Sequence, residues 1–169
     1  GKAHGDAVCN RTDETHRLLG NISSGKHTVM VAPRRYGKSS LCERAFLQSR
    51  LPWAKVDFHL AITERDIERF LINAAIRLIG QSVGQIDKFT AVIKNFVKHL
   101  TPKFALSSEH MRLELEVTNQ STAAENVCEA ILLLDKLLCE KDQRAVLLLD
   151  EFQEVGAISR GKGIEGAIR

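Results

Sequence analysis

The chain lacks long apolar runs, and this absence excludes one large class of proteins. None of its 169 residues belongs to an apolar stretch near the roughly 18 residues that a membrane span needs. The first ten residues, GKAHGDAVCN, also lack the apolar centre of a signal peptide. We therefore expect a cytoplasmic protein that does not associate with membranes.

A strong excess of charge is absent as well. Lysine and arginine number 24 against 21 acidic residues, which gives a formal net charge of +3. This is too small for the field of the whole protein to indicate nucleic-acid binding. No stretch combines aromatic and basic residues as single-strand binding surfaces do. Apolar residues make up 44% of the chain, which is enough for a soluble domain with one sizeable core.

The cysteines lack the spacing of a metal site or redox centre. They stand at positions 9, 42, 128 and 139, without a Cys-x-x-Cys pair or a histidine cluster beside them. We expect buried free thiols in a reducing compartment.

What the sequence does contain is an alternation of apolar segments with strand and helix character. Short β-rich runs predict buried strands, and apolar positions at helical spacing predict helices. Strands are expected at 28–32 (TVMVA), 53–60 (WAKVDFHL) and 144–152 (RAVLLLDEF). Helices are expected at 11–22, at 38–49, from the Thr63/Asp66 start pair to about 78, at 86–100, at 121–140 and near the C-terminus.

This order predicts an α/β fold with a parallel sheet flanked by helices. Two segments of period two, KFALSS at 103–108 and RLELEV at 112–117, predict a small β-hairpin or an edge ribbon. Ligands of parallel sheets bind at the carboxyl ends of the strands, so polar residues there are candidates for function.

The stretch VMVAPRRYGKSSLCERAF, residues 29–46, places Gly37-Lys38-Ser39 between a predicted strand and a helix. Such a turn suits phosphate, because backbone N–H groups and a helix N-terminus converge there. Gly37 permits the backbone conformation before the lysine, Lys38 supplies a charge, and Ser39 offers a hydroxyl to Mg²⁺. The position that opens such loops with glycine holds Ala32, which adds one methyl group. The alternative is a solvated turn that carries the tripeptide by chance.

Asp150 and Glu151 end the last predicted strand. In a phosphate-hydrolysing site, the first acid holds Mg²⁺ and the second orients and deprotonates the attacking water. The alternative is a solvated strand end.

APRRYGKSSL and LLLDEFQEV together resemble the archaeal-type P-loop ATPase family, which occurs in archaea and bacteria and is similar to AAA+ and STAND ATPases. VCNRTDETHRLL at 8–19 resembles the family's opening segment, and GIEGAIR resembles the helix after the second acid motif. The resemblance covers residues 1–169 as the N-terminal part of an ATPase domain, with a hairpin insertion at 101–120.

The resemblance implies a role for each motif residue. Lys38 would bind the β- and γ-phosphates of ATP, Ser39 and Asp150 would hold Mg²⁺, and Glu151 would be the catalytic base. Lys38 and Glu151 are thus the catalytic candidates. The nucleotide-binding candidates are Pro33, Arg34, Arg35, Tyr36, Gly37, Lys38, Ser39 and Ser40, the last at the α-phosphate end, with Val8 and Cys9 near the adenine.

Three residues near these motifs have alternative interpretations. Arg34 and Arg35 could contact the γ-phosphate, a neighbouring subunit or nucleic acid, or form an exposed pair of modest electrostatic value. Asp57, at the end of the second predicted strand, is expected to be a cap or a hydrogen-bond partner rather than a catalytic acid.

By the same resemblance, a strand with a polar sensor residue would lie between the lysine-loop strand and the acid-motif strand. It would follow Arg169, as would lid helices and a winged-helix domain that could bind nucleic acid or protein. Since an open slot leaves backbone groups unpaired, we expect self-association or a rearranged sheet.

Two functions follow from these expectations. The first is Mg²⁺-dependent ATP binding and hydrolysis by a module that acts as a switch or motor in a larger protein, with weak or no turnover in these residues alone. The second is a nucleotide-binding regulatory or nucleic-acid-associated module with little or no turnover. The choice of ATP over GTP rests on the resemblance.

Overall fold

The computed structural model describes residues 11–33, 36–83, 100–107, 110–117, 122–158 and 163–168, and its elements alternate between helix and strand. In chain order they are α1 (Thr12–Ser23), α2 (Lys38–Ser49), β1 (Trp53–Asp57), the short 3₁₀ helix η2 (Phe58–Leu60), α3 (Glu64–Val83), β2 (Leu100–Ser107), β3 (His110–Val117), α5 (Ala123–Glu140), β4 (Val146–Asp150), α6 (Gln153–Ile158) and α7 (Gly163–Ile168). The chain is thus a mixed α/β protein, as the pattern of segments predicts.

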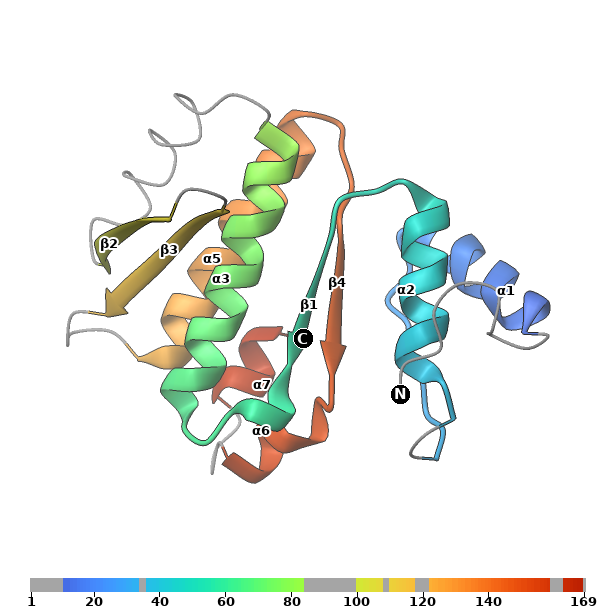
Figure 1. Ribbon diagram of the computed structural model, residues 1–169, viewed down its shortest axis with the longest axis horizontal. Coiled ribbons are helices and arrows are strands. Elements are labelled where there is room, and N and C mark those ends of the chain that lie inside the picture. The colour runs from blue at the N-terminus through green and yellow to red at the C-terminus, as the bar shows by residue number, and fades with distance from the viewer. Residues whose placement is uncertain are drawn as a thin grey trace.

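A two-stranded parallel sheet, β1 beside β4, stands at the centre of the molecule (Figure 1). The register pairs Trp53 with Val146 at one end and Asp57 with Asp150 at the other. Helices α1 and α2 lie on one side of the sheet, and α3, α5 and α7 lie on the other side (Figure 1). Among the described residues, no third strand joins this sheet.

The predicted strand at 28–32 is wrong. Residues 26–33 follow an irregular course, and the side chains of Val29 and Val31 are 89% and 91% exposed. A run of β-rich residues becomes a strand only when a neighbouring strand pairs with its N–H and C=O groups. Met30 nevertheless packs against α1 and α2, which keeps this segment close to the rest of the fold.

The larger core fills the space between the sheet and α3, α5 and α7. Ala54 and Val56 of β1 point into it, because alternate residues of a strand face opposite sides. They pack with fully buried side chains that include Phe58, Ile67, Leu78, Val127, Val155 and Ile164. This core holds β1 and β4 in place from one side.

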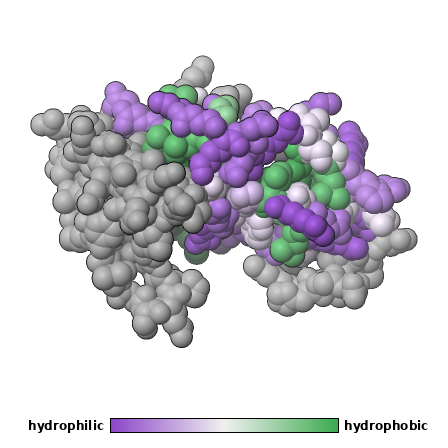
Figure 2. Space-filling model, turned by 90° about the horizontal axis from the view of Figure 1, so that it is seen from above, coloured by the Kyte–Doolittle hydropathy of each residue, from purple (hydrophilic) through white to green (hydrophobic). Residues whose placement is uncertain are grey.

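The smaller core lies on the other face of the sheet. Leu18 of α1 packs with Cys42, Ala45 and Phe46 of α2, and Trp53 contacts Phe46 with ring centroids 5.5 Å apart. Val146 and Leu148 of β4 contribute only partly buried side chains. In the view from above, apolar surface is visible in a hollow on the side of the molecule that carries α1 and α2 (Figure 2).

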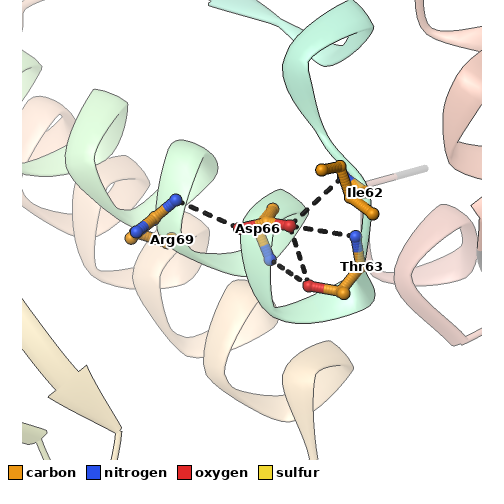
Figure 3. A network of polar contacts seen from close by, with 4 residues as sticks. All are labelled: Ile62, Thr63, Asp66 and Arg69. Atoms are coloured by element: carbon orange, nitrogen blue, oxygen red, sulfur yellow. Dashed lines mark hydrogen bonds and ion pairs between the residues drawn. The ribbon is translucent and has the colours of Figure 1, made fainter.

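The start of α3 matches the predicted Thr63/Asp66 pair (Figure 3). Asp66 Oδ2 accepts hydrogen bonds from the backbone N–H groups of Ile62 and Thr63, and the Thr63 hydroxyl accepts one from the Asp66 N–H. Arg69 donates to the other carboxylate oxygen at 3.0 Å. These bonds hold the pKa of Asp66 below its ordinary value, mainly through the Thr63 hydroxyl.

Strands β2 and β3 form the predicted hairpin. They pair antiparallel with each other, with Leu100 opposite Val117 and Ser107 opposite His110. The helix predicted at 86–100 lies outside the described residues except for its last residue. Leu100 begins β2, so the prediction that the helix extends this far is wrong, because the strand pairing starts before Pro102.

The cysteine prediction is correct at only one of the three described positions. Cys42 is buried, Cys128 is half-buried and Cys139 is exposed near the end of α5, all as free thiols. Cys139 lies on the solvent-facing side of α5, away from the apolar core, so its thiol stays exposed. Across the described ranges, each helix is too short or too polar to cross a membrane.

Candidate nucleotide site

The site begins at the N-terminus of α2. Lys38 is the first residue of this helix, and Gly37 precedes it in the left-handed conformation, with φ of 74°. A side chain at that φ is strained, so glycine suits the turn. Gly37 has no side chain that could cap the helix, which leaves the N-terminal backbone to be satisfied in other ways. A further turn is closed by the Tyr36 N–H, which donates to the Pro33 carbonyl oxygen at 3.3 Å.

Ser39 and Asp150 meet at this helix end. The Ser39 hydroxyl donates a hydrogen bond of 2.9 Å to Asp150 Oδ2, across 111 positions of the sequence. Ser39 lies in the first turn of α2, and Asp150 is the last residue of β4. The two residues expected to hold Mg²⁺ are therefore neighbours in the fold.

Lys38 is held within its own loop. Its ammonium group donates to the backbone carbonyl oxygen of Ala32, six residues earlier, at 2.9 Å. Arg11, just before α1, donates from its guanidinium to the Tyr36 carbonyl oxygen at 2.8 Å. Arg11 thereby links the start of α1 to Tyr36 of the phosphate-loop candidate, a contact that the sequence did not indicate.

Lys55 is a functional candidate that the sequence reading missed. Its ammonium group lies 2.7 Å from Asp150 Oδ2 and 3.9 Å from Asp57 Oδ2. Lys55 and Asp57 are alternate residues of β1 and so face the same side of the sheet. The sequence did carry a signal for this pair, because Lys55 and Asp57 are the charged residues of an otherwise apolar strand and stand at alternate positions.

The charges of this cluster reinforce each other. Burial alone would raise the pKa of Asp150, but hydrogen bonds from Lys55 and Ser39 and the Lys55 charge hold that pKa below its ordinary value. Burial alone would lower the pKa of Lys55, but its hydrogen bond and ion pair with Asp150 raise it. Both groups are therefore charged at neutral pH.

Glu151 follows directly after β4 with an unusual backbone. Its φ is 54°, and Gln153 donates a side-chain hydrogen bond to its carboxylate. Arg50 and Asp142 also have positive φ, but they follow the ends of α2 and α5, where this conformation is common. Glu151 stands instead at the end of a strand, and strained residues of this kind cluster at functional sites.

The remaining predicted residues have different environments. Ser40 is half-buried in α2, Pro33 is exposed, and Tyr36 is 64% exposed beside the loop. Arg34, Arg35, Val8 and Cys9 lie outside the described residues. Asp57 is a cap as predicted, since its carboxylate accepts a hydrogen bond from the His59 N–H at the start of η2.

The donor set at this point fits Mg²⁺. A hydroxyl and a carboxylate are oxygen ligands of the kind that Mg²⁺ prefers, and this ion keeps much of its shell for water and substrate phosphates. In the described part of the chain, no three acidic, histidine or cysteine side chains gather into a metal site made by the protein alone. A metal ion here would take its other ligands from water and, when a nucleotide is bound, from the phosphates.

No family model matches the chain, and no curated protein or solved structure is significantly similar to it.

Proposed function

We propose that the protein is a P-loop module for Mg²⁺-dependent binding and hydrolysis of ATP. The observation that carries the proposal is the hydrogen bond between Ser39 and Asp150. A turn with a chance Gly-Lys-Ser would have no reason to place its serine against an acid from the end of a distant strand. The acid, the hydroxyl and the helix N-terminus instead converge at the carboxyl end of the sheet, where such folds bind ligands.

Lys38 and the loop before it would bind the phosphates. Gly37 gives the chain a left-handed turn directly before α2, and the positive end of the helix would favour an anion there. Lys38 would exchange the Ala32 carbonyl oxygen for the β- and γ-phosphate oxygens. The exchange replaces a neutral acceptor with a charged one, which makes the stronger hydrogen bond.

Ser39 and Asp150 would hold Mg²⁺, which supplies charge neutralisation between the phosphate oxygens when it is bound. Glu151 would accept a proton from the water that attacks the γ-phosphorus, while the bond from that phosphorus to the β,γ-bridging oxygen breaks and ADP leaves. Glu151 comes directly after Asp150 in the sequence. It is only partly buried, so water can reach its carboxylate. Gln153 would keep that carboxylate oriented through its hydrogen bond.

Titration calorimetry with ATP and Mg²⁺ tests the proposal. Lys38→Ala should remove detectable ATP binding, because no other described side chain of the loop offers a positive charge to the terminal phosphates. Lys136→Ala, at an exposed position of α5, is the matched control and should bind as the parent does. ATP affinity of the parental value in Lys38→Ala would contradict the proposal.

A module that holds nucleotide without turnover is the second candidate, in a regulatory or nucleic-acid-associated role. It is favoured by the partners of the two acids. Asp150 is paired with Lys55, and Glu151 is hydrogen-bonded to Gln153, so both acids already have protein partners in this arrangement. ATP binding without measurable phosphate release would select this candidate.

A further inference from the structure

Asp150 Oδ2 receives two donors at once. The Lys55 ammonium lies 2.7 Å from this oxygen, and the Ser39 hydroxyl donates to the same atom at 2.9 Å. The side chains of Lys55 and Asp150 are 22% and 16% exposed, so water screens the pair only partly. The positive charge of Lys55 therefore occupies the carboxylate oxygen that the proposed function assigns to Mg²⁺.

The position of this charge follows from the sheet register. Asp57 and Asp150 are register partners, so two carboxylates end neighbouring strands on the same face. Like charges this close repel each other unless a cation lies between them. Lys55, two residues before Asp57 on that face, supplies the cation.

We infer that Lys55 is a tethered counter-ion which competes with the divalent cation for Asp150, and so sets how tightly the site binds metal. The inference rests on the proposed function. Lys55 forms ion pairs with Asp150 and Asp57, and it acts on the site through Asp150. It is a positioning residue for the metal ligand.

The lysine has an alternative position close by. A surface pocket of about 220 Å³ lies along β1 and α3, and Lys55 and Asp57 both line it. The Lys55 ammonium is already 3.9 Å from the Asp57 carboxylate. When a divalent cation takes Asp150, a rotation of the flexible lysine side chain toward Asp57 preserves an ion pair for it.

Binding of Mn²⁺ to the nucleotide-free protein tests this inference, with the free ion measured by electron paramagnetic resonance. Lys55→Met keeps much of the aliphatic length but removes the charge, and should bind Mn²⁺ about three- to tenfold more tightly than the parent. Lys55→Arg keeps the charge and should bind as the parent does. Lys136→Met, on the exposed face of α5, controls for the loss of one lysine. Lys55→Gln is a second neutral variant in case the methionine variant fails to fold.

The double variant Lys55→Met/Asp150→Asn identifies the site, because the gain in Mn²⁺ affinity should vanish when Asp150 loses its charge. Mn²⁺ affinity that is unchanged or weaker in both neutral variants overturns the inference. The proposed function would still stand after such a Mn²⁺ result if the parent binds MgATP and Asp150→Asn weakens that binding. If neither the parent nor the neutral variants bind Mn²⁺ or MgATP, both the proposed function and this inference are overturned.

Discussion

Asp57 and Asp150 face each other at the last paired position of the central sheet, yet the structure gives them different partners. Asp57 accepts a hydrogen bond from the backbone at the start of η2, whereas Asp150 accepts one from the Ser39 hydroxyl at the start of α2. Their shared neighbour Lys55 is closer to Asp150 by more than an ångström. Asp57 is therefore a cap, whereas Asp150 is the acid that we propose as the Mg²⁺ ligand.

This difference leads to a matched pair of substitutions. Asp150→Asn should weaken MgATP binding by about tenfold or more, because the amide cannot supply the negative charge that Mg²⁺ prefers. Asp57→Asn should weaken MgATP binding much less, since asparagine caps helices as well as aspartate does and only the second ion-pair partner of Lys55 is lost. Calorimetric titrations with and without Mg²⁺ measure both effects. Equal losses in the two variants would refute the assignment of Asp150.

Glu151→Gln should preserve ATP binding and reduce turnover. The amide has a similar shape but cannot accept a proton from water, and general-base contributions are typically about 10² to 10⁴ in rate. The measurement is the rate of phosphate release from ATP by the full-length protein. Glu154→Gln, three residues later in α6, is the control. Hydrolysis at the parental rate in Glu151→Gln would mean that Glu151 is not the base.

The effect of the left-handed backbone at Gly37 can be measured without a steric clash of an added side chain. A Cβ at Gly37 meets no atom within 4 Å, so Gly37→Ala would act through the strained φ of 74° alone. We expect a loss of about 1 kcal/mol in the free energy of unfolding, together with weaker ATP binding.

Gly20→Ala is the opposite case. Gly20 lies inside α1, and a Cβ there also meets no atom within 4 Å. Since alanine is the better helix former, this variant should gain about 0.5 to 1 kcal/mol. Urea unfolding of both variants gives the comparison, and equal shifts would contradict the left-handed turn at Gly37.

Cys42 should be resistant to thiol reagents in the folded protein. Burial, followed by the charge of Asp150, raises its pKa to about 11, and its sulfur lies 3.3 Å from that of Met30. At pH 8 we expect rapid labelling of exposed Cys139 and slow labelling of Cys42, as measured by mass spectrometry of peptides. Labelling of both cysteines at one rate would show that the smaller core is open.

The same raised pKa predicts a pH dependence of stability. Because the thiol stays neutral in the folded state but ionises in the unfolded chain above about pH 8.5, stability should fall as pH rises from there toward 11. The free energy of unfolding of Cys42→Ala should lack this contribution. Equal pH profiles of the parent and Cys42→Ala would contradict the shifted pKa.

Self-association is also expected. Val29 and Val31 are almost fully exposed, and within the described ranges β4 has only β1 as a strand partner. Exposed β-rich residues and an unpaired strand edge favour pairing between copies. Light scattering at micromolar concentration should show dimers or larger species, and Val29→Lys/Val31→Lys should reduce them. A parent that stays monomeric throughout this range would contradict the expectation.

The sequence by itself determined the elements that depend on near neighbours. The bounds of α2, the Thr63/Asp66 start of α3, the capping role of Asp57 and the β2–β3 hairpin all follow from residues a few positions apart. Turn chemistry, caps and helical spacing are local, and a local pattern is visible in the sequence.

Only the tertiary structure decided what depends on distant partners. The segment at 28–32 has the composition of a strand but remains irregular and exposed, because a strand forms only where another strand pairs with it. The contacts of Asp150 with Ser39 and Lys55 likewise required the parallel register of β1 and β4 and the packing of α2 against that sheet. The motifs therefore named Ser39 and Asp150 in advance, whereas the charge of Lys55 could be assigned to Asp150 only when the fold brought both to one place.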